Sequence, residues 1–339
     1  MTAKVALLGY GLAGSVFHAP FISTTPGLEL SVVVTGNGKR SEQALREHPG
    51  VTVVGTADEV WERAGELDLA VIATPNSSHV PLGLAALEAE LAVVVDKPLA
   101  LNAAEGSRLV DAATESGLLL TVFQNRRWDG DFLTLRRLLA ADELGRVHRF
   151  ESRFERWRPE VGGGWRERVP AEGGGLLLDL GSHLVDQALQ LFGPASGLYA
   201  ELDARREGAV AEDDIFLALE HESGVHSHLW ASALAADPGP RFRVLGDRGA
   251  FVKRGLDAQE EDLRSGRRPT DLGFGEEPRE RWGRLVTGAE SREVPTEPGS
   301  YGSFYAGVAA SLRDGVPPPV DPRDAVAVLE LLDEARGRA

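Results

Sequence analysis

The stretch LLGYGLAG, residues 7–14, follows a short apolar run and places glycines at positions 9, 11 and 14. Glycines with this spacing allow a tight turn, a close approach of the backbone to a pyrophosphate, and close packing of the following helix. The N-terminus of that helix adds N–H donors and the positive end of a dipole. The pattern follows the first predicted strand, so a dinucleotide site is favoured over a plain β–α turn. Its expected residues are Gly9, Tyr10, Gly11, Leu12 and Gly14.

Short apolar runs alternate with amphipathic stretches over the first 123 residues. The runs are rich in Val and Leu, and near-continuous apolar strands are typical of a parallel sheet that is covered on both faces. The alternation therefore predicts a Rossmann fold with a doubly wound parallel sheet. Its strands are predicted at residues 5–8, 30–34, 51–54, 69–73, 91–95 and 118–123, and two of its helices at 78–88 and from Asn102 onward.

The pattern changes after Phe123 to helices followed by longer alternating runs, which predicts an α+β domain with a large open, mainly antiparallel sheet. One long helix is expected to cover one face of this sheet. The predicted helices span residues 131–141, 176–192, 301–313 and 322–335, and the strands 147–154, 198–205, 215–220, 225–231, 242–245 and 250–254. The charged, Gly- and Pro-rich segment 257–280 is predicted to be a solvated loop.

Length and composition limit the classes of protein. A chain of 339 residues predicts about two domains, and we expect a dinucleotide-binding domain over 1–123 and a substrate-binding and oligomerisation domain over 124–339. No apolar run reaches the roughly 20 residues that span a bilayer, and the net charge of -16 disfavours nucleic acid as a partner. The absence of cysteine excludes disulfides and thiol catalysis. We therefore expect a cytoplasmic protein.

The end of the second predicted strand, VVVTGNGKRSE at residues 32–42, bears on the choice of cofactor. Sites that prefer NAD carry an acidic residue here, which binds the ribose 2′-hydroxyl. No carboxylate occurs before Glu42, whereas Thr35, Asn37, Lys39 and Arg40 offer donors and positive charge to a 2′-phosphate. NADP is therefore favoured over NAD; the alternative is that Lys39 and Arg40 only solvate the start of a helix.

The motifs GYGLAG, IATPNSSH, DKP and LLLDLGSHLVDQ occur in this order, and in this combination the chain resembles the Gfo/Idh/MocA family of oxidoreductases. FHAPFI, FQNRRWDGDF and WRE are most similar to its bacterial scyllo-inositol dehydrogenase-like branch. The resemblance implies a Rossmann domain followed by an open-sheet domain, with a sugar held between them. It also implies assembly into homodimers or homotetramers.

The stretch VVVDKPLALN, residues 93–102, keeps one of only four lysines at the end of a predicted buried strand. Ligands of doubly wound sheets bind at the carboxyl ends of strands, where the Lys97 ammonium can donate to a sugar hydroxyl and favour a developing alkoxide. The alternative is a surface lysine. The family motif is usually Glu-Lys-Pro; Asp96 replaces the glutamate here, and the resemblance implies a cis peptide at Pro98 and cofactor contacts from Asp96 and Lys97.

Asp179 and His183 are four residues apart in the apolar stretch 176–192, so both project from one helix face. A neutral imidazole is suited to remove a hydroxyl proton near pH 7, and we expect His183 to be the catalytic base. Asp179 is expected to orient the substrate or the histidine and to pair with Lys97. Asp186 is expected on the helix surface or behind the site. The alternative is a helix-start aspartate and a core histidine.

The resemblance also implies further lining residues. The turn after the fourth strand is expected to contact the cofactor through Thr74, Pro75, Asn76 and His79. Residues expected to bind the sugar, besides Asp179 and His183, are Asn125, Arg126, Trp165 and Arg166. We expect no metal site, because His221 is separated from His226 and His228 by a turn-like segment and no carboxylate completes a set.

These features predict an NADP-dependent dehydrogenase that acts on a ring CH–OH of a cyclic polyol or sugar such as an inositol. The alternatives are a glycoside-processing enzyme that uses bound NAD transiently, and a dinucleotide- or sugar-sensing regulator without catalysis. We also expect a homo-oligomer built through the open sheet of the second domain, with Val225, Leu229 and Ala231 on that face or toward the core.

Overall fold

The computed structural model describes residues 2–338, except for the side chains of Trp165 and Arg166. The chain divides into two compact units, and each combines three segments of the sequence. The first unit contains the residues up to 125 with 260–274 and 300–326, and the second contains 126–259, 275–299 and 327–339. The predicted division into a dinucleotide-binding domain (1–123) and a substrate-binding and oligomerisation domain (124–339) stays a prediction.

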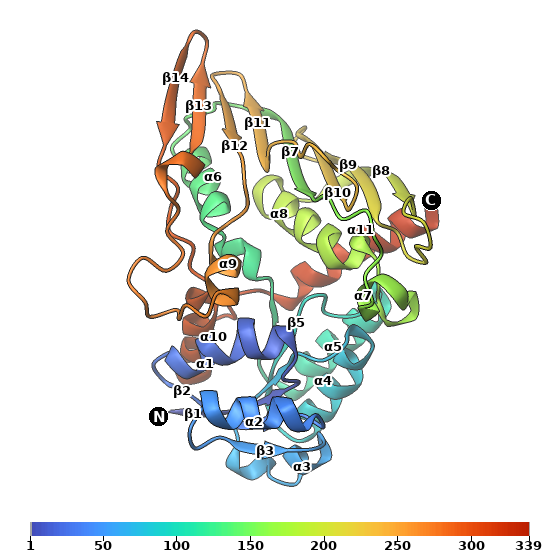
Figure 1. Cartoon of the computed structure of the whole chain (residues 1–339), viewed down its shortest axis with the longest axis vertical. Coiled ribbons are helices and arrows are strands. Elements are labelled where there is room, and N and C mark those ends of the chain that lie inside the picture. Colours follow the sequence, from blue (N-terminus) through green and yellow to red (C-terminus); the bar gives the residue numbers. More distant parts are fainter. Residues whose placement is uncertain (1, 339) are drawn as a thin grey trace. The chain divides into compact units, whose positions relative to one another are not determined.

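The first unit contains a six-stranded sheet in the order β3-β2-β1-β4-β5-β6 (Figure 1). Every neighbouring pair is parallel, which confirms the predicted doubly wound Rossmann sheet. All residues of β4 and β5 are buried, as expected where helices cover both faces. The strands are β1 (Ala3–Leu8), β2 (Leu28–Val34), β3 (Thr52–Val54), β4 (Leu69–Ile72), β5 (Ala92–Asp96) and β6 (Leu120–Phe123).

Helical segments connect these strands, and one further helix of the first unit, at residues 302–314, follows much later in the chain. A π-helix, η1, leads directly into α1, and Asn102 caps α5 by accepting a hydrogen bond from the Glu105 N–H, at 2.9 Å. The segments are η1 (Ala13–His18), α1 (Ala19–Thr24), α2 (Gly38–Glu47), α3 (Asp58–Trp61), η2 (Ala64–Glu66), η3 (Asn76–Ser78), α4 (His79–Glu88), α5 (Ala103–Ser116) and α10 (Gly302–Asp314).

The second unit contains an eight-stranded sheet in the order β14-β13-β12-β11-β7-β10-β9-β8 (Figure 1). Only β7 and β10 pair in parallel, so the predicted mainly antiparallel sheet is confirmed. The hairpin of β13 and β14 is not among the predicted strands, because its charged sequence buries few apolar side chains. The strands are β7 (Val147–Glu155), β8 (Ala195–Asp203), β9 (Asp214–His221), β10 (His226–Ser232), β11 (Phe242–Gly246), β12 (Ala250–Lys253), β13 (Gly283–Thr287) and β14 (Glu290–Val294).

The predicted long helix of the second unit is a π-helix, η6 (Leu177–Gly181), continued by α8 (Ser182–Phe192). Both contact β10, and Leu229 and Ala231 of this strand are fully buried. Val225 is buried as well, so all three residues face the core rather than the open face. Strand alternation leaves Trp230 on the opposite face of the sheet.

Shorter helices complete the second unit, and three helical segments contain a boundary between the units. Those of the second unit are α6 (Gly130–Ala140), α7 (Trp165–Arg168), η5 (Pro170–Glu172) and η7 (Arg279–Arg281). The three at a boundary are η4 (Asn125–Trp128), α9 (Gln259–Arg264) and α11 (Pro322–Arg338). No helix of the described residues is long and apolar enough to cross a membrane.

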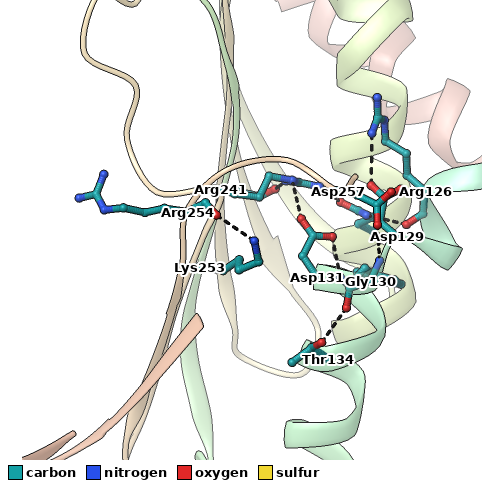
Figure 2. Close-up of polar contacts among 12 residues, drawn as sticks. Arg126, Asp129, Gly130, Asp131, Thr134, Arg241, Lys253, Arg254 and Asp257 are labelled. Atoms are coloured by element: carbon teal, nitrogen blue, oxygen red, sulfur yellow. Dashed lines mark hydrogen bonds and ion pairs between the residues drawn. The ribbon is translucent and has the colours of Figure 1, made fainter. Parts of the chain in front are cut away.

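The prediction that residues 257–280 form a solvated loop is wrong for the first part of this segment. Asp257 and Gln259 are buried, and α9 begins at Gln259. The Asp257 carboxylate accepts hydrogen bonds from the Gly130 N–H and the Gln259 N–H, both at 2.8 Å (Figure 2). These bonds to the starts of α6 and α9 satisfy a buried carboxylate that the composition of the segment did not reveal.

Ion pairs close to Asp257 are also buried. Arg241 pairs with Asp131 at 3.4 Å, and Lys253 pairs with Glu277 at 3.0 Å. Figure 2 shows how Asp131, Lys253 and Asp257 from three different segments gather at the start of α6. Unpaired charges could not be buried here without a large cost, so these partners fix how the segments pack.

We expect the titration of Asp257 to lower the stability of the protein as the pH rises. Burial, with repulsion from Asp131, raises the pKa of Asp257 to about 6. Between about pH 4 and 6 the folded chain holds a proton that the unfolded chain has lost, so the unfolding free energy falls through this window. The decrease is at most about 3 kcal/mol, and denaturant unfolding between pH 4.5 and 8 measures it.

The Asp257→Asn variant is expected to lack this part of the pH dependence, although loss of a hydrogen bond lowers its stability at every pH. Asp237→Asn, at an exposed carboxylate of the same unit, serves as the control. Identical slopes for Asp257→Asn and the wild type would contradict the assignment.

Candidate functional site

The glycine-rich turn after β1 has the geometry that the sequence predicts. Gly9 has a φ of +98°, and a Cβ placed on it would lie 2.5 Å from the Ala73 carbonyl oxygen. A Cβ on Gly14 would lie 2.0 Å from the Gly9 carbonyl oxygen. The first and third glycines are therefore required by close backbone contacts, and they bring β1, the following η1 and the end of β4 together.

Arg40 lies beside this turn. A Cβ placed on Gly11 would be 3.8 Å from its Nη1 atom. Arg40 and Lys39 are both exposed in the first turn of α2. Asn37 caps the same helix by accepting from the Arg40 N–H at 3.1 Å, and the Thr35 hydroxyl oxygen accepts from the Asn37 N–H at 3.3 Å. The Arg40 charge thus lies beside the turn, while Asn37 shapes the helix start.

Tyr10 and Leu12 differ in where their side chains lie. The Tyr10 hydroxyl donates to a Glu47 carboxylate oxygen at 2.8 Å, and the ring is buried. Burial first, and then Glu47, raise the pKa of Tyr10 far above its ordinary value. Leu12 is 46% exposed at the start of η1. Because the Tyr10 hydroxyl is bound to Glu47, we expect any contact of Tyr10 with a phosphate to come from its backbone.

His79 connects the turns that follow β4 and β5. Its Nδ1 lies 2.8 Å from the Pro98 carbonyl oxygen and its Nε2 lies 3.0 Å from the Thr74 carbonyl oxygen. The ring is 1% exposed, and this burial lowers its pKa. His79 therefore supports the two turns from inside. Of the other residues predicted to contact the cofactor from the turn after β4, Pro75 is exposed and Asn76 is buried.

Asp96 and Lys97 lie at the end of β5, and the Lys97–Pro98 peptide is cis, as the resemblance implied. Lys97 is half-buried. An Asp96 carboxylate oxygen accepts from the Lys97 N–H at 2.9 Å and lies 3.7 Å from His18 Nε2. Burial by itself raises the pKa of Asp96, but His18, Lys97 and His79 outweigh it, so the pKa lies below its ordinary value.

His18 is not among the residues predicted for the site. It ends η1 and is fully buried, and its Nδ1 lies 2.5 Å from the Tyr305 hydroxyl oxygen. Tyr305 is 287 residues away in the sequence. The only available signal was the position of His18 in the FHAPFI motif, since no spacing rule links a histidine to so distant a tyrosine.

Asp179 and His183 occupy η6 and α8 of the second unit, with Asp179 half-buried and His183 buried. π-Helical turns are often found at functional positions. The His183 ring lies against Phe154 of β7, with ring centroids 6.3 Å apart. The guanidinium groups of Arg126 and Arg241 lie over the same Phe154 ring, at 4.7 and 4.0 Å from its centroid.

The residues that follow His183 on α8 anchor this helix. Asp186 forms a bidentate ion pair with Arg127 at 2.9 and 2.6 Å and is buried, so it does not lie on the helix surface. Gln187 accepts from Arg241 at 2.7 Å and donates to the Arg126 carbonyl oxygen at 2.9 Å. The polar stripe that begins with Asp179 and His183 thus continues into contacts that hold the helix.

The other predicted sugar-binding residues are only partly described. Asn125 is buried, and the buried Arg126 guanidinium lies 3.2 Å from Asp129. The side chains of Trp165 and Arg166 lie outside the described residues. A role in sugar binding stays a prediction for all four.

A cavity of about 270 Å³ in the second unit includes Asp179 in its wall. Its charged lining residues are Arg156, Arg158, Arg206, Glu167, Asp179 and Glu212, three guanidinium groups against three carboxylates. Guanidinium groups only donate and carboxylates only accept hydrogen bonds, whereas each sugar hydroxyl does both. The lining therefore offers both donors and acceptors of hydrogen bonds.

The histidines considered as metal ligands have other contacts. His221 Nδ1 lies 2.8 Å from the Gly193 carbonyl oxygen, and its Nε2 lies 2.8 Å from the Ser227 hydroxyl oxygen. Over residues 2–338, as far as their side chains are described, no group of three or more His, Asp or Glu side chains is arranged to hold a metal ion.

Comparison with known proteins agrees with this geometry. Residues 3–124 match the oxidoreductase family with an NAD-binding Rossmann fold, and residues 132–252 match the Gfo/Idh/MocA C-terminal domain. The chain is 40% identical over 332 residues to the uncharacterized oxidoreductase YdgJ of Escherichia coli, covering 97% of this chain and 94% of that protein.

It is 36% identical over 338 residues to scyllo-inositol 2-dehydrogenase (NADP(+)) IolW of Bacillus subtilis, covering 98% of this chain and 93% of that protein. The solved structure of the oxidoreductase yvaA from Bacillus subtilis superimposes with a TM-score of 0.93 at 35% identity, covering 99% of this chain and 96% of that one. The two halves of the chain match the two domains of one family, and the glycine-rich turn lies in the half that matches its NAD-binding domain. The protein therefore belongs to the Gfo/Idh/MocA family of NAD-binding oxidoreductases.

Proposed function

We propose that the protein is an NADP-dependent dehydrogenase of a cyclic polyol, with an inositol as the leading substrate class. The observation that carries the proposal is the similarity, over 98% of the chain, to a protein described as an NADP-dependent scyllo-inositol 2-dehydrogenase. The polar, charge-balanced cavity that includes Asp179 supports a polyol as the substrate.

The residues around the glycine-rich turn fit NADP. The close contacts at Gly9 and Gly14 shape a turn whose backbone can approach a pyrophosphate closely. Lys39 and Arg40 supply positive charge at the end of β2, where a carboxylate would favour NAD. When bound, the nicotinamide ring supplies a hydride acceptor.

The chain's own residues supply the proton chemistry. We assign His183 as the base that accepts the hydroxyl proton, because neutral imidazole is matched to this task near pH 7. Lys97 donates a hydrogen bond to the oxygen that becomes alkoxide-like as its proton leaves, and this stabilises the transition state. Asp179, in the turn before His183, orients the substrate through its hydroxyl groups.

Removing either group that acts on the transition state should slow turnover. We expect Lys97→Ala and His183→Ala each to lower kcat about a hundredfold or more, with NADP affinity and thermal unfolding close to the wild type. The measurement is net NADPH formation from inositols, which also separates a dehydrogenase from an enzyme that uses its cofactor transiently. Lys4→Ala and His148→Ala, at exposed positions, are matched controls. Turnover like the wild type in either site variant would refute the mechanism.

The choice of cofactor makes a separate prediction. We expect the double variant Lys39→Ala, Arg40→Ala to bind NADP more weakly by at least about a hundredfold and NAD almost unchanged, because charge-assisted bonds to the 2′-phosphate contribute about 1.5–3 kcal/mol each. Calorimetric titration with both dinucleotides measures this. Arg46→Ala, an exposed arginine in the last turn of the same helix, is the control. Equal losses for NADP and NAD would argue against NADP specificity.

We also propose a homo-oligomer that forms through the open face of the second unit's sheet. Aromatic side chains lie together on this face: Phe216 packs 5.1 Å from Trp230 and 6.2 Å from Tyr199, which is 57% exposed. Arg153 lies over Trp230 at 3.9 Å. Exposed aromatic groups with arginine are typical of protein interfaces.

We expect light scattering at micromolar concentration to give a multiple of 36.3 kDa. Tyr199→Glu combined with Trp230→Glu should shift the mass toward the monomer, because charge would be buried at the interface. A wild-type mass of 36.3 kDa would show that this face is stable in water.

A further inference from the structure

Glu212 connects the strand β9 region to the segment that carries Asp179. It lies two residues before β9 begins, and its carbonyl oxygen accepts from the Leu176 N–H at 2.9 Å. Its carboxylate oxygen Oε1 accepts from the Leu177 N–H at 3.1 Å. The side chain therefore caps the start of η6 from a position 35 residues away in the sequence.

The carboxylate is held closely against this turn. Gly175 has a φ of +103°, and a Cβ placed on it would lie 2.2 Å from Glu212 Oε1 and 2.5 Å from Oε2. The Gly175 carbonyl oxygen in turn accepts from the Asp179 N–H at 3.3 Å. The Glu212 carboxylate contacts Gly175 and the Leu177 N–H, and Gly175 is hydrogen bonded to the Asp179 N–H. These contacts fix the position of the carboxylate relative to the backbone of Asp179.

Glu212 and Asp179 also line the same cavity. Arg206, another lining residue, is bound to Asp213 and Glu167, both at 2.8 Å, so its charge is already neutralised by them. Burial raises the pKa of Glu212, although the Leu177 N–H and Arg336 oppose this effect. A partly desolvated acceptor in a cavity gains from a hydrogen bond that a ligand donates.

We propose that Glu212 is a specificity-determining residue, which accepts a hydrogen bond from a ring hydroxyl of the substrate while it fixes the turn that carries Asp179. The proposal rests on the proposed function and narrows its substrate class. The lining carries as many guanidinium groups as carboxylates, although Arg206 is already paired with Asp213 outside it. The proposal takes the substrate to be an uncharged polyhydroxylated ring rather than a uronate or a sugar phosphate. A buried acceptor rejects analogues that lack the matching donor.

The test compares the wild type with Glu212→Gln, Glu212→Ala and Glu207→Gln. Glu207 is an exposed carboxylate in the same loop and is the matched control. The readouts are kcat and KM for NADP reduction with inositols and their monodeoxy and mono-O-methyl derivatives, together with thermal unfolding. Glucuronate and inositol monophosphate complete the panel as charged rings.

We expect the wild type and Glu207→Gln to discriminate against at least one monodeoxy derivative by about a hundredfold or more. In Glu212→Gln this discrimination should fall about tenfold or more, mainly through KM, while the unfolding temperature stays near the wild type because the amide oxygen still accepts from the Leu177 N–H. Glu212→Ala should lose the discrimination and also the cap, and unfold at a lower temperature.

Two outcomes would overturn the proposal while leaving the dehydrogenase intact. Unchanged discrimination in Glu212→Gln, with a lower unfolding temperature in Glu212→Ala, would reduce Glu212 to a cap. A wild-type preference for the charged rings would overturn the uncharged substrate class. If the wild type reduced NADP with no member of the panel, the proposed function would fail, and this inference with it.

Discussion

The second unit depends on the burial of the Arg241 guanidinium group. Arg241 is 2% exposed, and a charge at this depth must be paired and hydrogen bonded. Its partners come from three elements: Ser152 on β7, Gln187 on α8 and, as an ion pair, Asp131 at the start of α6. Phe154 and Phe242 pack against its face. Because one planar group has these partners, both helices have a defined position on the sheet.

This constraint extends to the candidate catalytic residues. Gln187 lies one turn after His183 on α8, and the His183 ring and both arginines contact the same Phe154 ring. At the other end of this helical run, Glu212 caps η6 just before Asp179. The helical segment is therefore anchored on both sides of the Asp179–His183 pair. Such support is what holds a catalytic side chain within the small tolerance that proton transfer needs.

In the first unit, two buried histidines hold the turns next to Lys97 in place. His79 contacts the Pro98 and Thr74 carbonyl oxygens, and His18 lies beside the Asp96 carboxylate. Both rings are buried, and they contact the backbone and the carboxylate next to Lys97. Lys97 is thus presented from a turn whose neighbours are closely packed.

Local patterns in the sequence were enough to predict the sheet of the first unit, six of the eight strands of the second unit's sheet, the glycine turn, and the helix with Asp179 and His183. Each depends on neighbours in the chain: the period of apolar residues, the φ of +98° at Gly9, and the spacing of four residues along a helix. The same locality explains the errors. The charged composition of residues 257–280 indicates solvent, and it carries no sign that Asp257 binds the start of α6, 127 residues away.

Tertiary structure alone decided which polar groups share an environment. It brought Tyr305 to His18, and Glu212 to the turn before Asp179, because hydrogen bonds of buried groups are satisfied by whichever segments the packing brings near. It also decided that Leu229 faces the core while Trp230 stays on the open face, since alternation separates the two faces of a strand but does not say which one a helix covers.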